Sequence, residues 1–173
     1  MGSAARPTRV VASLLPDSIG LGGALAGLAG GLAMALVAAL ISFVERQDIW
    51  REAKAIASVD LGAQAVAQAG FAALPVLIGT LIHLIIAMLL GAIFGIVTRR
   101  WLQLPSDFGI PVVAGLAYGL LVWLVAYFVA LPVVDPWLLD SYAPAFIVQH
   151  IVYGSVNRLC YAWLRPCPYD ASE

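Results

Sequence analysis

The fold of this chain is decided by residues 77–95, which read LIGTLIHLIIAMLLGAIFG. No formal charge falls between Asp60 and Arg99, on either side of this stretch. Small residues and one histidine recur in it every four positions, at Gly79, His83, Ala87, Gly91 and Gly95. A helix stacks such positions in one narrow stripe, and stripes of small residues are typical of helices that pack closely inside a membrane. The stretch therefore predicts a transmembrane helix that contacts a second helix.

The composition indicates an integral membrane protein. Hydrophobic residues make up 62% of the 173-residue chain and charged residues only 11%, whereas soluble domains average about 25% charged residues. The few charges lie near the ends of apolar stretches and form no basic stripe, which argues against nucleic acid as a partner. We therefore expect residues 1–173 to form a single, all-α membrane domain in contact with lipid.

Four stretches are long enough to cross a bilayer, whose core of roughly 30 Å needs about 20 apolar residues per helix. They are residues 19–44, 71–98, 108–131 and 143–164. The first is longer than the apolar region of a signal peptide and predicts a retained anchor. Four spans would place both termini on the same side of the membrane.

The distribution of basic residues predicts which side that is. The side of the termini holds Arg6, Arg9, Arg99, Arg100, Arg158 and Arg165, and the opposite side holds Arg46, Arg51 and Lys54. Because cytoplasmic loops carry the excess of Lys and Arg, both termini are predicted to be cytoplasmic. The side chain of Arg158, inside the fourth stretch, is expected to extend to the cytoplasmic headgroups.

Glycines at four-residue spacing also occur outside residues 77–95. The first and third stretches contain GxxxG units, which let two helix backbones approach closely, and a further glycine follows the histidine of the fourth stretch by four positions. The predicted helix-packing residues are Gly23, Gly27, Gly31, Gly79, Gly91, Gly95, Gly115, Gly119 and Gly154.

Two segments of the chain resemble each other. Residues 26–32, AGLAGGL, match residues 114–120, AGLAYGL, at six of seven positions. The similarity predicts a tandem duplication of a two-helix hairpin, with a glycine-rich first helix and a histidine-bearing second helix in each copy. Because each copy spans the membrane twice, the two halves would be related by an axis along the membrane normal. His83 and His150 would then lie at the same depth in a four-helix bundle.

The longest polar stretch, residues 45–62, predicts an amphipathic helix on the outer side. Ile49, Trp50, Ala53, Ile56 and Ala57 share one helical face, with charged residues opposite. This face could lie on the outer leaflet, or it could dock a partner's extramembrane domain. The predicted interface residues are Ile49, Trp50 and Ile56, together with Trp137 in the short acidic turn after the third span.

The two histidines are the main candidates for a binding site, because an imidazole inside the hydrocarbon needs a partner. Three interpretations are open for His83 and His150. Each ring could bond to a neighbouring helix and fix the packing; the pair could hold one b-type haem as axial ligands; or one ring could donate to a carbonyl oxygen of a quinone. A metal site is not expected, since no Asp or Glu lies inside any predicted span to complete a ligand set.

No catalytic constellation is visible in the sequence, and we expect a protein that is not an enzyme. Proton- or ion-coupled transport usually needs a carboxylate or charged relay near mid-membrane, and the predicted spans contain no acidic residue. Cys160 and Cys167 both fall on the predicted cytoplasmic side, where thiols stay reduced. They are expected to be unpaired.

Several short motifs resemble an uncharacterised family of small prokaryotic membrane proteins. They are His83 followed by Gly91 and Gly95, Gly115–Gly119 leading to Leu131–Pro132, and His150 to Gly154. The resemblance covers residues 20–160 and implies four helices with one histidine in each even-numbered helix, but no established activity. The chain departs from the pattern at Asn157 and Arg158, where such helices usually continue with small or aliphatic residues.

In size and character the chain is also similar to accessory subunits of bacterial respiratory or photosynthetic electron-transfer complexes, of which the quinol-oxidising alternative complex III is one. That similarity implies a non-catalytic subunit of the bacterial plasma membrane that packs against other membrane subunits. The alternative is a small b-type cytochrome or a quinone-site protein that uses His83 and His150.

Overall fold

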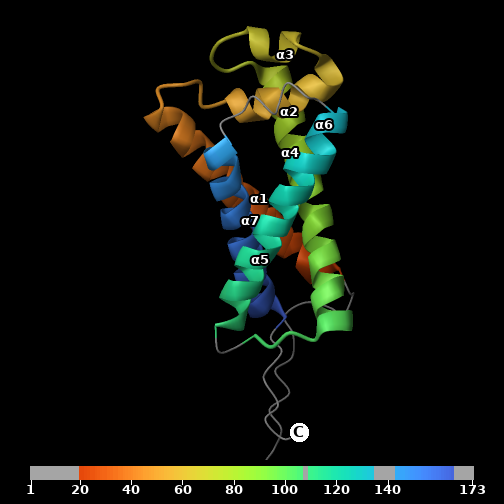
Figure 1. Ribbon diagram of the computed structural model, residues 1–173. Helices are drawn as coiled ribbons and strands as arrows, with labels where there is room; N and C mark the ends of the chain where they lie inside the picture. Colours follow the sequence, from red (N-terminus) through yellow and green to blue (C-terminus); the bar gives the residue numbers. More distant parts are fainter. Residues whose placement is uncertain (1–19, 107–108, 135–142, 166–173) are drawn as a thin grey trace, which may run out of the picture.

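The computed structural model describes residues 20–106, 109–134 and 143–165, and the described part is helical without any strand (Figure 1). In chain order the elements are α1 (Leu21–Val44), α2 (Arg51–Leu61), α3 (Gln64–Ala67), α4 (Ala73–Val97), the π-helical η1 (Thr98–Leu102), α5 (Ile110–Val125), the π-helical η2 (Ala126–Ala130), α6 (Leu131–Val134) and α7 (Ala143–Leu164). The all-α prediction is confirmed for these residues.

Three helical segments of the described residues are long and apolar enough to cross a membrane: Leu21–Val44, Ala73–Leu102 and Ile110–Val134. They coincide with the first three predicted spans. Their outward side chains are apolar and strongly exposed, as at Leu36 (72%) and Val113 (68%), a pattern that suits lipid contact. The fourth predicted stretch forms α7, which is helical over the predicted residues but is not among the three apolar candidates.

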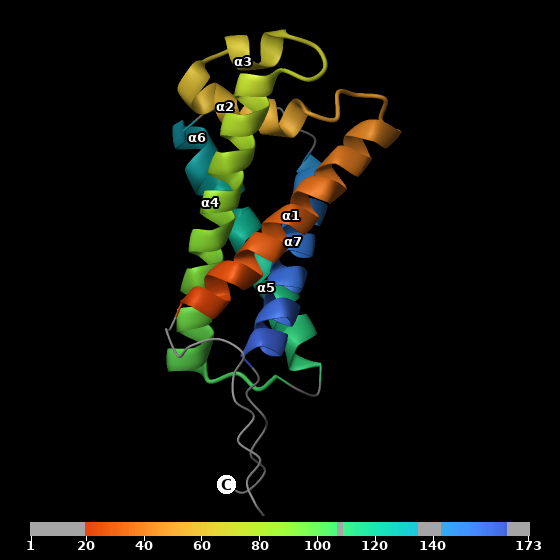
Figure 2. The same ribbon diagram turned by 180° about the vertical axis from the view of Figure 1, so that it is seen from behind.

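The long helices form two crossed pairs, α1 with α4 and α5 with α7, and α1 also contacts α7. In both pairs, glycines bring the two backbones together. A Cβ atom on Gly91 of α4 would lie 2.6 Å from the Cα atom of Gly27, and one on Gly154 of α7 would lie 2.5 Å from the Cα atom of Gly119. Figure 2 shows α1 crossing α4 and diverging from it toward the α2 end. All nine predicted packing glycines lie against another helix.

A second small-residue face of α1 was not singled out in the sequence. A Cβ atom on Gly30 would lie 3.0 Å from the ring of Tyr153 on α7, and one on Gly22 would lie 3.0 Å from the side chain of Arg165, which directly follows α7. Ala26 lies between them at the same spacing and is fully buried. The run of small residues therefore packs α1 on α4 along one face and on α7 along the next, which joins the two pairs.

Three tyrosine hydroxyls attach α5 and α7 to α4. Tyr118 donates to the carbonyl oxygen of Leu90 at 2.7 Å, Tyr153 to that of Ala87 at 2.8 Å and Tyr161 to that of Gly95 at 3.1 Å. Each hydroxyl is thereby satisfied inside an apolar bundle, where an unpaired one would be costly.

Helix α2 lies crosswise over one end of the bundle (Figure 1) and packs on α4, where the Ala53 carbonyl lies against Gly79. Gly79 therefore contacts α2, while Gly91 and Gly95 of the same stripe contact α1. Much of the apolar face of α2 is turned to the protein, and Ala57 is fully buried. Burial on α4, in addition to any lipid or partner contact, explains why this segment is amphipathic.

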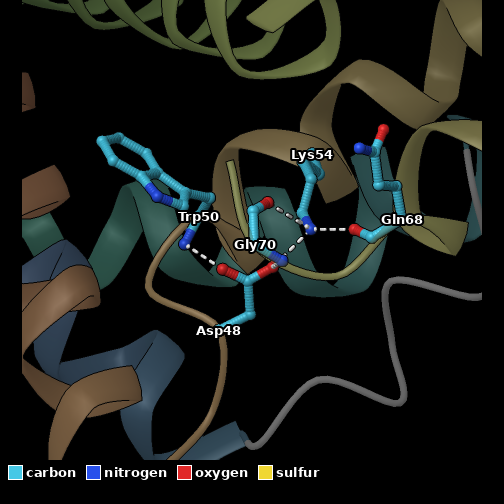
Figure 3. A network of polar contacts seen from close by, with 5 residues as sticks. All are labelled: Asp48, Trp50, Lys54, Gln68 and Gly70. Carbon is cyan, nitrogen blue, oxygen red and sulfur yellow. Dashed lines mark hydrogen bonds and ion pairs between the residues drawn. The ribbon is translucent and has the colours of Figure 1, made fainter. Parts of the chain in front are cut away.

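A partly buried ion pair holds α2 in this position (Figure 3). The Lys54 ammonium, only 3% exposed, pairs with Asp48 and donates to the carbonyl oxygens of Gln68 at 2.6 Å and Gly70 at 3.2 Å. The Asp48 carboxylate also accepts from the backbone N–H groups of Trp50 at 3.0 Å and Gly70 at 3.1 Å. The amphipathic pattern places Lys54 on the outer, charged face, and that prediction is wrong.

The basic end of α7 also differs from expectation. Arg158 is 1% exposed, and its Nη2 atom donates to the carbonyl oxygens of Pro105 at 2.8 Å and Leu104 at 3.4 Å. Its side chain therefore binds the backbone that follows η1, and the prediction that it extends to lipid headgroups is wrong.

Candidate ligand cavity

A cavity of about 290 Å³ lies at the α2 end of the bundle, between α1, α4 and α7 and under α2. Most of its wall is made of alanine and aliphatic side chains. The polar and aromatic lining residues are Trp50, Glu52, Thr80, His83, Phe146, Gln149 and His150. Apolar cavities with a few converging polar groups are typical small-molecule sites. This cavity brings together the two histidines that the sequence singles out.

His83 reaches the cavity from α4. Its Nε2 atom lies 2.9 Å from the carbonyl oxygen of Gly31 on α1. Because a carbonyl oxygen only accepts, Nε2 carries the proton and donates. The close approach of α1 and α4 along their glycines makes this bond reachable, so His83 joins the two helices near one wall of the cavity.

His150 reaches the cavity from α7 and is 6% exposed. Its Nδ1 atom lies 2.8 Å from the carbonyl oxygen of Phe146, one turn earlier in the same helix, and therefore donates to it. The ring also packs edge-on against the Phe146 ring, with centroids 4.3 Å apart. These two contacts fix the ring orientation.

The arrangement does not fit the predicted b-type haem. At His83 the nitrogen left for a metal is Nδ1, because Nε2 donates to Gly31. Nδ1 is bonded to the ring carbon that carries the Cβ atom and is the more hindered of the two ring nitrogens. The cavity also lies at the lower end of the range for ligand pockets, roughly 300–1,000 Å³. Among the described residues, no three His, Cys, Asp or Glu side chains are grouped to hold a metal ion.

Glu52 on α2 is a cavity residue that the sequence analysis missed. Burial raises the pKa of its carboxyl, nearby Arg51 opposes that shift, and Glu45 adds to it. The predicted spans contain no acid, yet α2 brings one over the two histidines. The sequence signal that could have pointed to Glu52 is its place next to Ala53, a member of the predicted apolar face.

The predicted interface residues lie around the mouth of the cavity. Ile49 and Trp50 line it and are 42% and 36% exposed, while Ile56 lines it and is half-buried. Trp50 also meets the ring of Phe71 edge-on, with centroids 5.2 Å apart. Trp137 lies outside the described residues, so its predicted role stays a prediction.

Cys160 lies away from the cavity, on α7. It has a free, half-buried thiol beside a small core formed by Ala26, Phe94 and Tyr161. Cys167 lies outside the described residues. The position of Cys160 indicates packing.

No family model, curated protein or solved structure matches this chain. The resemblance to a family of small four-helix membrane proteins therefore stays a prediction, and the functional argument rests on the geometry of the cavity.

Proposed function

We propose that this protein binds a small, lipid-soluble molecule with a polar head, at the cavity between α1, α4 and α7. The observation that carries the proposal is that the chain's two histidines, 67 positions apart (150 − 83), line one largely apolar cavity. Gln149 and Thr80 supply further polar groups, and Trp50 and Phe146 supply aromatic walls. A single-ring head group suits such a space, and the quinone-site hypothesis is the predicted function that agrees best with it.

Filling the cavity is expected to abolish ligand binding without unfolding the protein. Ala38 is buried and lines the cavity, so Ala38→Leu places three additional carbon atoms in the empty space. Decylbenzoquinone and decylhydroquinone serve as probes, and quenching of tryptophan fluorescence reports binding, with Trp50→Phe identifying the cavity signal. We expect saturable binding to the unmodified protein and at least a tenfold loss in Ala38→Leu.

The matched control is Ala73→Leu, at an exposed position of α4 that does not line the cavity. It is expected to bind the probes as the unmodified protein does. If neither probe binds, or if Ala38→Leu binds both unchanged, the cavity is not a site for such molecules.

We further propose that α7 is a fourth membrane span. Its 22 residues extend for about 33 Å at 1.5 Å per residue, enough to cross a bilayer core. Its hydropathy is lowered by Gln149, His150, Asn157 and Arg158, each no more than 6% exposed. Polar side chains that face the protein do not oppose insertion beside α1 and α5. This is tested by labelling single cysteines, placed at one terminus or the other, with an impermeant reagent in sealed vesicles. An even number of spans puts both termini on the same side of the membrane, so the two cysteines should be equally accessible to the reagent.

The tandem duplication is also a proposal, supported by the way the two pairs pack. Gly27 of α1 and Gly115 of α5 are aligned in the repeat. Gly27 lies against Ala87 and Gly115 lies against Gly154, and each of these contacted residues follows a histidine by four positions. If the two copies are equivalent, alanine at Gly27 and alanine at Gly115 should destabilise the protein to a similar extent. A large effect at one position and none at the other would argue against equivalence.

The second proposal is an accessory role in a larger membrane complex. The complex would lie in a bacterial plasma membrane, with both termini of this chain in the cytoplasm. Its support is the exposed apolar and aromatic group at the α2 end, formed by Ile49, Trp50 and Phe71, because aromatic side chains are enriched in protein–protein interfaces. Co-migration of redox subunits with this chain on a native gel is the expected result. Migration as a lone chain in mild detergent would contradict it.

A further inference from the structure

The hydrogen-bond partners of the two histidines restrict what their free nitrogens can do. At His150 the proton is on Nδ1, which donates to the Phe146 carbonyl, so Nε2 of the neutral ring carries a lone pair. At His83 the proton is on Nε2, which donates to the Gly31 carbonyl, so Nδ1 carries the lone pair. Both neutral rings are therefore left with a hydrogen-bond acceptor and no second donor.

These acceptor nitrogens are open to a ligand. Both histidines line the cavity. In the part of the chain that the structure describes, neither histidine nitrogen is among the fully enclosed side-chain atoms that lack a hydrogen-bond partner. The free nitrogen of each ring is accordingly accessible, and no described residue supplies it with a hydrogen bond.

The rings cannot easily reverse their roles. Turning either imidazole to offer an N–H to the cavity would set an unprotonated nitrogen against a backbone carbonyl, lone pair against lone pair. For His150, the contact with the Phe146 ring also holds the orientation. The neighbouring Gln149 and Thr80 each contain a donor and an acceptor, so they can adapt to either kind of ligand.

We infer that the cavity selects molecules whose polar head donates hydrogen bonds, and that it binds a hydroquinone in preference to the corresponding quinone. This inference rests on the proposed ligand-binding function and reverses the predicted role of histidine as a donor to a quinone carbonyl. A hydroquinone hydroxyl donates to the free nitrogen of His83 or His150. A quinone carbonyl at the same place repels that nitrogen and leaves it unsatisfied, which is how a polar site rejects an analogue.

The test compares decylhydroquinone, its dimethyl ether and decylbenzoquinone, under anaerobic conditions, by quenching of Trp50 fluorescence in the full-length protein. The ether keeps the ring and the chain but cannot donate, so it separates hydrogen bonding from redox chemistry. One hydrogen bond is worth about tenfold in affinity, and we expect the hydroquinone to bind at least tenfold more tightly than either analogue. In His150→Phe, which keeps a ring beside Phe146, the ratio is expected to fall toward one.

The outcomes separate the two proposals. If none of the three molecules binds, the proposed function and the present inference both fail. If the quinone or the ether binds as tightly as the hydroquinone, and Ala38→Leu abolishes that binding, the cavity is a ligand site and the donor selectivity is refuted. Should His150→Phe fail to fold, the ratio measured with the unmodified protein decides the question by itself.

Discussion

Gly154→Ala is expected to lower the melting temperature of the detergent-purified protein by roughly 4–8 °C, a net loss of about 2 kcal/mol. A Cβ atom at this position would lie 2.5 Å from the Cα atom of Gly119, across the contact between α7 and α5. The obstacle is backbone and cannot rotate away, so the two helices must separate. Overpacking of this kind costs about 3 kcal/mol, while alanine gains about 1 kcal/mol of helix propensity over glycine.

The sign of the change is what makes the prediction informative. Helix propensity alone predicts stabilisation, whereas the close helix contact predicts destabilisation. Val148→Ala serves as the control on the same helix, because Val148 is 48% exposed and its replacement adds no atom to a helix contact. A melting temperature that rises in Gly154→Ala would show that α5 and α7 do not approach as closely as described.

Lys54→Met is expected to release α2 from the end of the bundle while leaving the long helices folded. The change removes the buried partner of a partly buried ion pair, and it leaves the Asp48 carboxylate and two carbonyl oxygens without their shared donor. Because the Asp48 side chain that is left behind is 23% exposed, the cost is below that of breaking a fully buried pair, about 1–3 kcal/mol. Hydrogen exchange followed by mass spectrometry should show faster exchange over residues 48–72, with little change in α5 and α7.

The matched control is Arg51→Met, three residues earlier on the same helix. Arg51 is exposed, and its guanidinium donates to the side chain of Gln47, which is exposed as well. Surface contacts of that kind contribute little to stability. Exchange over residues 48–72 should be unchanged in this variant. Equal effects of the two substitutions would mean that the buried network does not hold α2.

The same network gives α2 a defined response to acid. Burial by itself would raise the pKa of Asp48, but hydrogen bonds from Lys54, Trp50 and Gly70, together with the Lys54 charge, outweigh it and lower the pKa below its ordinary value of 3.8. A lowered pKa means that Asp48 contributes stability above about pH 3.8 and loses that contribution as the pH falls through the lower value of the folded protein. Asp48→Asn should remove this dependence from the exchange of residues 48–72.

The positions of the long helices followed from the sequence because hydrophobic length is a local property. Three predicted apolar stretches are helical in the structure: 19–44 forms α1, 71–98 forms α4 and part of η1, and 108–131 forms α5, η2 and the start of α6. The sequence could not show which glycine face meets which helix. Gly79 and Gly91 lie on one stripe, yet the first contacts α2 and the second contacts α1, because α2 folds back over the divergent ends of the helices.

The candidate site was predictable only in part. The two histidines stood out because imidazoles are rare and costly in apolar helices. Their roles depended on acceptors that periodicity does not reveal: a carbonyl of α1 for His83 and a carbonyl of its own helix for His150. Glu52 and Lys54 belong to a segment that reads as a surface helix, and tertiary contacts alone place one in the cavity and bury the other.

By itself, the sequence determined that this is a helical protein with several apolar helices whose small residues permit close packing, because composition and four-residue spacing act within each helix. The tertiary structure decided which faces meet, that both histidines line one cavity under α2, and which nitrogen of each ring is left free. The free nitrogen of each ring depends on which backbone carbonyl its other nitrogen meets. Every residue type provides the same carbonyl, so the spacing of side chains along the chain does not reveal the acceptor.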